Sequence, residues 1–510
     1  MRKLVSVLLA VALLAGMLPA ALASEPYTLD IYWVGNADSP EVRAVVEDAV
    51  NEYIGPLIGA HVSFHIVPWD DWKAKVVDVL TDKESRKSAK MDLVFTADWE
   101  YYSDLVEAKA LYPLDDLLDR DGQEILASLP EGFWSGVRIK GGIYGVPTNK
   151  ELCVPQGYIV NKTAALAIGW DPEKDEIRTT ADLEPWLRKY KEKYPGRYPF
   201  LMDMSPAGRW VDEPWINDWS GLSQNAVAMK MAKNDDGEYD ETVYSIFETP
   251  EEEEHIRLMY QWVQEGFINP DCVSMTKSQA EEIFGSGDFL VFTQPLKGNG
   301  IKAVEMYTSC HKEQYDTFEL AEIIMQPKYI VTAHTAGSMF AIPATPLNDP
   351  DKAMQYLNLM HSDSRLVNLM LFGVEGKNYT KVDDLRVTLI PDAAWYPVHG
   401  GAWTVGDVTL QYVLENEDPE KNAKLIEFAG DAVETSSLGF RFNKKKLKAE
   451  IEAVNAVIGE YADALLCGVV DPDDPEKGIE AMKAALKEAG IDTLVAAAQE
   501  QYEKWKASLK

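Results

Sequence analysis

The sequence has few of the residues that usually carry catalysis or metal chemistry. Only four cysteines and seven histidines occur among 510 residues. No two cysteines have the CxxC spacing of a zinc or redox site, and their wide separation favours buried thiols over disulfides. No H-E-x-x-H, G-x-S-x-G, Walker A or G-x-G-x-x-G pattern is present. We therefore expect no catalytic residue, no metal and no cofactor.

Positive charge is also scarce. The chain has 49 lysines and arginines against 83 aspartates and glutamates, a formal net charge of −34. Nucleic acids and anionic membranes attract basic surfaces, so this balance argues against both as partners. An acidic surface of this kind favours a soluble chain.

One long apolar run is present, at the amino terminus. Arg2 and Lys3 precede the run Leu4–Leu18, which is too short to span a bilayer comfortably, and Ala21–Ala23 has the A-x-A form of a signal-peptidase site. We expect residues 1–23 to be a signal peptide. Met17 stands where a lipoprotein would have its cysteine, so we expect an exported protein, extracellular or periplasmic, without a lipid anchor.

The mature chain of roughly 490 residues exceeds the size of a single hydrophobic core, which predicts at least two lobes. Its first hundred residues alternate strand and helix patterns, and this βαβαβ order predicts a mostly parallel sheet. Ligands bind such sheets beyond the carboxyl ends of the strands, here Val34–Asp38 and Ala97–Tyr101. The patterns comprise a strand through Leu29, Ile31 and Trp33, a helix opened by Ser39 and Pro40, a strand through Val62, Phe64 and Ile66, a helix through Trp69, Trp72, Val76 and Val79, and a buried strand Leu93–Phe95.

Two later segments have the pattern of crossovers between lobes. The glycine-rich passage Gly141–Asn149 leads to an extended run at Gly157–Val160, and Ser338–Pro343 suits a returning strand. A helix capped by Asn348, Asp349 and Pro350 follows that strand. The carboxyl end holds amphipathic helices.

In their order and spacing, four features resemble the extracellular solute-binding proteins of family 1, the maltodextrin-binding-protein-like receptors of ABC importers. They are the signal peptide, the passage from Asp92–Phe95 through Asp98 and Trp99 to Ala110–Asp115, the crossover Gly142–Pro147 closing at Tyr158–Lys162, and the return Phe340–Pro343 with its capped helix. In the carboxyl third, Leu371–Tyr379, Leu438–Phe440 and Ala489–Asp492 are similar to the subgroup with the DUF3502 domain, known as LipO or YtcQ-like.

The resemblance implies an α/β, two-lobed periplasmic-binding fold, type II-like, with discontinuous lobes joined by a hinge and a helical carboxyl-terminal region. We predict a first lobe of residues 24–150 with about 332–394 and a second lobe of 151–331 with about 395–510. A DUF3502-like region is expected at the carboxyl end, at about 370–510. The implied partners are a small-molecule ligand, with an oligosaccharide favoured, and the membrane permease subunits of an ABC importer. We expect a monomer.

The alternative is a secreted glycoside hydrolase that uses a carboxylate pair, such as Glu213 with Asp218 or Asp98 with Glu100. Such pairs are easy to find among 83 acidic residues. Catalysis would need carboxyl groups about 5 Å or about 6.5–9.5 Å apart in different environments, which a sequence does not show. The same residue types serve a binder, because carboxylates and amides also hydrogen-bond sugar hydroxyls.

Tryptophan is the more informative residue, with 14 in the chain. A pyranose has an apolar C–H face and a rim of hydroxyls, so an aromatic ring beside amides or carboxylates suits it. Several tryptophans fall in expected loops with such neighbours, although core packing is nearly as good an interpretation for each taken singly. The candidate ligand-binding residues are Trp33, Asn36, Asp98, Trp99, Tyr101, Asn149, Glu151, Trp215, Asp218, Trp219, Trp395 and Trp403. Trp69, Trp72, Trp262 and Trp505 lie on helical patterns and are expected in the core.

Three further sequence patterns allow more than one interpretation. Asn149, Lys150 and Glu151 suit either a ligand-contacting floor after the crossover or a solvated hinge loop. His61 and His65 share one face of a strand, where two ordinary polar positions are a better interpretation than a metal pair. The acidic run at 251–254 fits a solvated helix start better than a calcium site.

Overall fold

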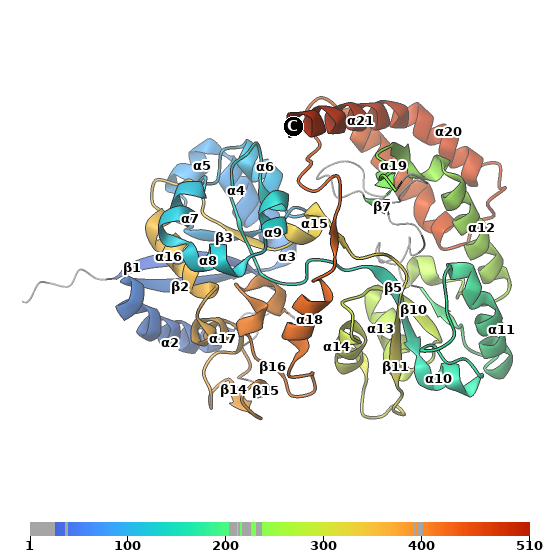
Figure 1. Ribbon diagram of the computed structural model, residues 1–510, viewed down its shortest axis with the longest axis horizontal. Helices are drawn as coiled ribbons and strands as arrows, with labels where there is room; N and C mark the ends of the chain where they lie inside the picture. Colours follow the sequence, from blue (N-terminus) through green and yellow to red (C-terminus); the bar gives the residue numbers. More distant parts are fainter. Residues whose placement is uncertain are drawn as a thin grey trace, which may run out of the picture.

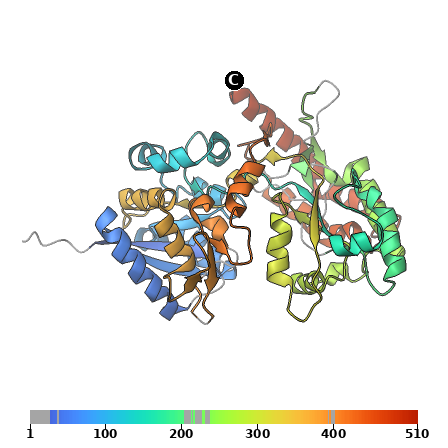
Figure 2. The same ribbon diagram turned by 60° about the horizontal axis from the view of Figure 1, so that its bottom comes forward.

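The computed structural model describes residues 26–35, 39–202, 212, 215–216, 226–230, 237–391, 393–395 and 401–509. Two lobes lie side by side, with the blue and cyan elements in one and the green elements in the other (Figures 1 and 2). Segments far apart in the chain contribute to each lobe, since β13 joins the sheet of the first lobe after the chain has built the second. None of the helices among these residues is long and apolar enough to cross a membrane.

The first lobe is built on a five-stranded sheet in the order β2-β1-β3-β13-β4. The strands β1, β2 and β3 are parallel, in the register Trp33↔Ile66 and Tyr32↔Val94, which confirms the predicted βαβαβ start. The returning strand β13 is antiparallel to β3 and β4. The strands are β1 Tyr27–Val34, β2 Ala60–Val67, β3 Leu93–Thr96, β4 Val146–Pro147 and β13 Met339–Ala341.

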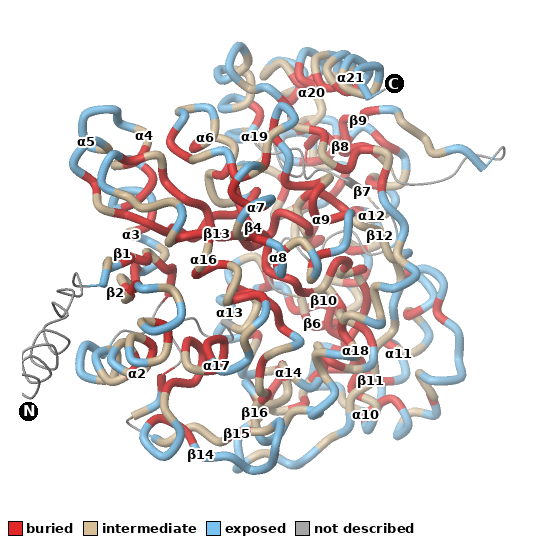
Figure 3. Tube along the Cα trace, turned by 60° about the vertical axis from the view of Figure 1, so that its left-hand side comes forward, coloured by how far each residue is buried: buried red, intermediate tan, exposed pale blue. Residues whose placement is uncertain are grey.

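Helices cover both faces of this sheet, so its strands are buried while the outer turns of α2 and α5 are exposed (Figure 3). The helices of the first lobe are α2 Pro40–Ile58, α3 Trp69–Trp72, α4 Asp78–Thr81, α5 Lys83–Ser88, α6 Tyr102–Glu107, α7 Asp115–Asp121, α8 Gln123–Ser128, α9 Glu131–Val137, α15 Thr332–Thr335, α16 Pro350–Met360 and α17 Ser364–Phe372. A π-helical turn at Lys73–Val77 joins α3 to α4.

Local sequence signals explain where the helices begin and end. The Ser39 side chain accepts a hydrogen bond from the backbone N–H of Val42, Pro40 occupies the first turn of α2, and Gly59 ends the helix at φ 63°. The Asp349 side chain caps α16 in the same way, as predicted. Each cap satisfies a backbone N–H that the first helical turn leaves without a partner.

The second lobe has a four-stranded sheet in the order β11-β5-β10-β6. The extended run after the first crossover forms its strand β5, which is antiparallel to β10 and β11. The elements are β5 Gln156–Asn161, β6 Phe200–Leu201, β10 Val291–Pro295, β11 Leu320–Ile324, α10 Lys162–Ala167, α11 Glu184–Lys193, α12 Pro250–Gln264, α13 Lys277–Ser286 and α14 Ile301–Cys310.

The carboxyl-terminal helices α19, α20 and α21 pack with α12 into a core of their own at the top of the second lobe (Figure 1). Small sheets and α18 complete the chain. Their bounds are β7 Trp215–Ile216, β8 Val227–Lys230, β9 Val243–Ser245, β12 Tyr329–Ile330, β14 Tyr379–Lys381, β15 Arg386–Leu389, β16 Val413–Leu414, α18 Lys421–Phe428, β17 Val433–Glu434, α19 Lys448–Leu466, α20 Ile479–Ala489 and α21 Ile491–Ser508.

The lobe boundaries stay a prediction, and one of them does not coincide with the packing. We placed a change of lobe at about residue 394, whereas Trp395 and Val405 lie in the same hydrophobic core as β1. Within the described part of the chain all four cysteines are buried and none forms a disulfide, as the wide spacing suggested.

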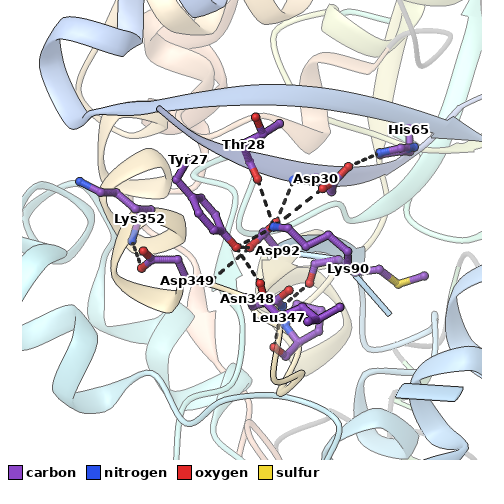
Figure 4. A network of polar contacts seen from close by, with 12 residues as sticks. Tyr27, Thr28, Asp30, His65, Lys90, Asp92, Leu347, Asn348, Asp349 and Lys352 are labelled. Carbon is purple, nitrogen blue, oxygen red and sulfur yellow. Dashed lines mark hydrogen bonds and ion pairs between the residues drawn. The ribbon is translucent and has the colours of Figure 1, made fainter. Parts of the chain in front are cut away.

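The amino-terminal edge of the first sheet is closed by a polar network, which we call the strand-start network (Figure 4). The fully buried carboxylate of Asp92 accepts hydrogen bonds from the Tyr27 hydroxyl at 2.6 Å, the Asp30 backbone N–H at 2.9 Å and the Asp349 backbone N–H at 3.3 Å. The Lys90 ammonium is also bound to it. The network therefore ties β1, the start of β3 and the start of α16 together.

Candidate functional site

Three tryptophans come together at the opposite, carboxyl-terminal edge of this sheet. Trp69 opens α3 just after β2, Trp99 follows β3, and Trp403 lies in a 3-10 turn at Gly401–Thr404. The ring centroids of Trp69 and Trp99 are 5.7 Å apart, those of Trp99 and Trp403 are 6.3 Å apart, and Trp69 stacks on Trp403 at 6.5 Å. We call these three residues the tryptophan cluster.

The buried ring of Phe95 supports the cluster from β3. It meets Trp69 edge to face at 6.0 Å and Trp403 edge to face at 5.8 Å. Edge-to-face contacts of this kind are favourable because the positive edge of one ring meets the negative face of another. The cluster is therefore fixed to the rigid sheet.

Trp99 is the exposed member of the cluster. Its side chain is 47% exposed although tryptophan is usually well buried, and its indole N–H donates to the Gly337 carbonyl at 3.0 Å. The hydrogen bond fixes the polar edge of the ring, so the ring presents an apolar surface to solvent. Such a surface matches the C–H face of a sugar.

Polar residues flank Trp99 on both sides. The Glu100 carboxyl group is half-buried, its burial raises its pKa above the ordinary value, and it has no hydrogen-bond or ion-pair partner among the described residues. Tyr101 is half-buried and adopts a left-handed backbone conformation at φ 59°, where α6 begins. Asp98 is buried and pairs with Arg441. The Glu100 carboxyl group is therefore an acceptor that the described residues leave without a partner.

The crossover residues are held by the protein itself. The Asn149 amide donates to the Asp407 carboxylate at 3.0 Å, and the backbone of Asn149 bonds to Gly406 and Val408. Lys150 pairs with Glu151 at 3.3 Å. Burial would raise the pKa of Glu151, but the ammonium groups of Lys150 and Lys297 outweigh it and hold the pKa at about 2. Glu151 is therefore ionised and sits in a network of paired charges.

That charge network extends from the second lobe to α18. Lys297 contacts Glu305 of α14 at 3.2 Å, Glu305 contacts Lys421 of α18 at 2.9 Å, and Lys421 contacts Glu417 at 2.6 Å. Its members are largely buried, so each charge needs its partner. These paired charges give the polar residues after the crossover, Asn149, Lys150 and Glu151, a role in supporting the structure.

Two candidate residues are corrected by the structure. Trp33 is fully buried, and its indole N–H donates to Thr404 at 3.1 Å. Trp395 is 2% exposed, and its indole N–H donates to the Met370 carbonyl at 2.8 Å. Both were expected to face a ligand, but they fill the core of the first lobe because helices cover both faces of the sheet.

Of the remaining candidates, one is described by the structure and three are not. Trp215 is half-buried on β7 in the second lobe, where its ring meets Tyr244 edge to face at 5.9 Å. Asn36, Asp218 and Trp219 lie outside the described residues. The structure thus brings Trp99 and Trp403 together, with Asp98 and Tyr101 beside them.

Trp69 is the residue that sequence reasoning missed. We expected it in the core with Trp72, and Trp72 is indeed 1% exposed. Trp69 is the first residue of its helix and only partly buried. The signal that selected Trp99, a position directly after a strand of the parallel sheet, also applies to Trp69 after β2.

Known proteins match both the sequence and this architecture. The model for a domain of unknown function, DUF3502, matches residues 436–507, a narrower region than the one predicted. A carbohydrate ABC transporter substrate-binding protein of Streptococcus pneumoniae serotype 4 is 25% identical over 502 residues, which cover 95% of this chain and 92% of that protein. Both matches support the resemblance of this chain to the extracellular solute-binding proteins of family 1.

Solved structures show the same two-lobed fold. The N-glycan transport solute binding protein of Streptococcus pneumoniae, NgtS, has a TM-score of 0.76 at 21% identity, over 95% of this chain and 100% of that one. Its complex with Man5GlcNAc has a TM-score of 0.65 at 22% identity, over 95% and 99% of the two chains. The α/β fold of a solute-binding protein, predicted from the four sequence features, is confirmed.

Proposed function

We propose that this protein is an extracytoplasmic receptor that binds an oligosaccharide on the tryptophan cluster and delivers it to the permease subunits of an ABC importer. The observation that carries the proposal is the exposed ring of Trp99, held by a backbone hydrogen bond at the strand-end edge of the first lobe. A sugar that stacks on this ring would find the Glu100 carboxyl group, which has no partner among the described residues, next to it. Removing such a ring should cost affinity and leave the fold intact.

The ligand class is supported by the relatives. The curated relative is described as a carbohydrate ABC transporter substrate-binding protein, and NgtS has been crystallised with Man1GlcNAc and Man5GlcNAc. These descriptions favour a binder over a glycoside hydrolase. In addition, the Asp98 carboxylate forms an ion pair with Arg441. Asp98 is one member of a carboxylate pair considered for hydrolysis.

Hinge closure on the ligand is part of the proposal. The crossovers near Gly145–Asn149 and Ser338–Thr345 lie beside each other, where the Thr148 backbone N–H donates to Ser338 at 3.0 Å. Two adjacent extended segments that join discontinuous lobes make a natural hinge.

Export by a signal peptide is also proposed, with cleavage after Ala23 and no lipid anchor. The first strand supports it, because β1 begins at Tyr27, soon after the expected cleavage site. Mass spectrometry of the secreted protein tests this proposal by its amino-terminal residue, expected to be Ser24.

A binding screen tests the receptor function. Man1GlcNAc, Man5GlcNAc, maltotriose and a tripeptide are each added to the purified protein while its melting temperature is followed. A true ligand at 100 times its dissociation constant should stabilise the fold by about 2.7 kcal/mol. The sugar recovered after a long incubation should be chemically unchanged. Steady release of a cleaved product would instead support the hydrolase, and a shift with the tripeptide alone would refute the carbohydrate class.

A further inference from the structure

The segment between β17 and α19 faces two lobes at once. We call residues 435–445 the strap, and in Figure 1 this orange segment runs from the region of α18 up between the two lobes. The DUF3502 match begins within it, at residue 436. Phe440 and Phe442 are 1% and 5% exposed and pack in the core of α19, α20 and α21. The residue between them points the other way.

That residue, Arg441, enters the first lobe. Its guanidinium pairs with the Asp98 carboxylate, donates to the Gly136 carbonyl at 2.7 Å and lies 5.5 Å from the ring centre of Tyr102. The side chains of Arg441 and Asp98 are 11% and 4% exposed. Burial lowers the pKa of Arg441 to about 9, so the guanidinium stays charged at neutral pH.

Further contacts fasten the strap to the first lobe. Lys444 pairs with Asp104 and Lys445 with Glu107, both at 3.3 Å and both on α6. The Gly439 backbone N–H donates to the Thr332 hydroxyl at 2.9 Å. Gly439 has φ +87°, and a side-chain carbon there would lie 2.6 Å from the Ser135 carbonyl oxygen, so the close approach requires glycine.

The Asp98 end of this contact belongs to the loop that carries Trp99. The Asp98 backbone N–H donates to the Ala336 carbonyl at 2.8 Å, and the Trp99 indole donates to the next carbonyl, Gly337. One side of the loop is therefore held by backbone bonds from the first lobe. The other side, the Asp98 carboxylate, is held by an arginine that is 343 positions away in the chain.

We propose that Arg441 is a positioning residue for ligand binding, through which the DUF3502 domain holds the Asp98–Trp99 loop and sets the orientation of the exposed ring. This assigns a role in the ligand site to a domain whose function is unknown. The effect on affinity rests on the proposed carbohydrate-binding function. The effect on the orientation of Trp99 does not rest on that function, because the contact between Arg441 and Asp98 is present without ligand.

The first test follows Trp99 in the ligand-free protein. Acrylamide quenching of fluorescence is measured in each variant and in the same variant with Trp99→Phe, and the difference isolates Trp99. Arg441→Met should change this difference. The matched control is Lys483→Met, which removes a lysine of α20 that pairs with Glu253 of α12 at 3.2 Å, within the second lobe. The control should leave the Trp99 signal as in the parent.

A double variant separates positioning from stability. Arg441→Met alone leaves a buried carboxylate without its counter-charge, whereas replacing a whole buried pair is often neutral or stabilising. Asp98→Asn with Arg441→Met should therefore regain the melting temperature of the parent and still show the altered Trp99 signal. Arg441→Lys keeps a charge that reaches toward Asp98, so it should restore part of the signal.

The second test is calorimetric titration with Man1GlcNAc. The double variant should bind at least tenfold more weakly than the parent. Parent-like Trp99 quenching and parent-like affinity in the double variant would overturn the proposal. If the parent itself does not bind Man1GlcNAc, the proposed ligand is wrong, while the quenching measurement still decides the role of Arg441.

Discussion

The two edges of the first sheet differ in how their polar and aromatic groups are used. At the strand starts, the carboxylate of Asp92 has four partners and nothing on it is left for a ligand. At the strand ends, Trp99 is exposed and the carboxyl group of the half-buried Glu100 has no partner among the described residues. The same sheet thus has one edge built for stability and another that leaves groups unused, which is where a ligand can gain contacts.

The largest expected effect is a loss of stability on replacing Trp33, and it would show that a position at the strand-end edge is not sufficient for binding. Trp33 lies near the end of β1 but is fully buried. Trp33→Ala removes a large core side chain and its hydrogen bond to Thr404, so it should lower the free energy of unfolding by about 3–5 kcal/mol. Denaturant unfolding measures this loss. A variant of unchanged stability that has lost ligand affinity would contradict the assignment of Trp33 to the core.

The next effect breaks the strand-start network. Asp92→Ala leaves the Tyr27 hydroxyl and the Lys90 ammonium without their buried acceptor, which should lower the free energy of unfolding by about 3 kcal/mol. Ligand affinity in the folded fraction should not change, because the network lies at the other edge of the sheet. Thermal unfolding and calorimetric titration give the two quantities.

A matched carboxylate serves as the control for Asp92. Asp363 also accepts a tyrosine hydroxyl, from Tyr53 at 2.6 Å, and it caps α17, but it is not at the centre of a network. Asp363→Ala should therefore cost only about 1 kcal/mol. An equal cost for the two variants would show that the network adds nothing beyond single hydrogen bonds.

The third effect falls on binding. Trp99→Ala should weaken oligosaccharide binding by about 2 kcal/mol, roughly thirtyfold, with little change in melting temperature, because the ring is half-exposed in the free protein. Trp186 of α11 is a half-buried tryptophan in the second lobe, stacked on Trp170 at 5.6 Å, and provides the control. Trp186→Ala should leave the affinity unchanged, and a common loss of affinity in both variants would point to general unfolding.

The smallest effect concerns pH. Burial raises the pKa of Glu100 in the folded protein, so the protonated form is favoured by folding and stability is lost as the pH rises through the folded pKa. Glu100→Gln should therefore raise the melting temperature slightly at pH 7 and have no effect below about pH 4, where the parent carboxyl group is protonated. A Glu100→Gln effect that is the same at both pH values would contradict the role of burial.

Much of the first lobe follows from local patterns. The period-two strands, the Ser39 cap and the Pro350 start of α16 are each determined by neighbours in the chain, and the structure has them where the patterns predict. The tryptophans were harder to assign. Trp33 and Trp99 both lie near strand ends. Trp33 is part of β1, in a sheet that helices cover on both faces, whereas Trp99 lies beyond the end of β3. A pattern of apolar residues does not separate these two cases.

The contacts between distant segments were beyond sequence reasoning. Trp403 reaches the cluster from more than 300 positions away, and nothing local in Phe440–Phe442 marks Arg441 as the partner of Asp98. Lone charged residues between aromatic ones usually face solvent. Only the folded arrangement shows that this one is buried against the other lobe.

The account depends most on the claim that a sugar occupies the strand-end edge, and a crystal structure of the protein with Man1GlcNAc or Man5GlcNAc tests it most directly. We expect a pyranose ring in van der Waals contact with the face of Trp99 and the Glu100 carboxyl group within hydrogen-bond distance of a sugar hydroxyl. A well-defined sugar that lies elsewhere and leaves Trp99, Trp69 and Trp403 untouched would contradict the account.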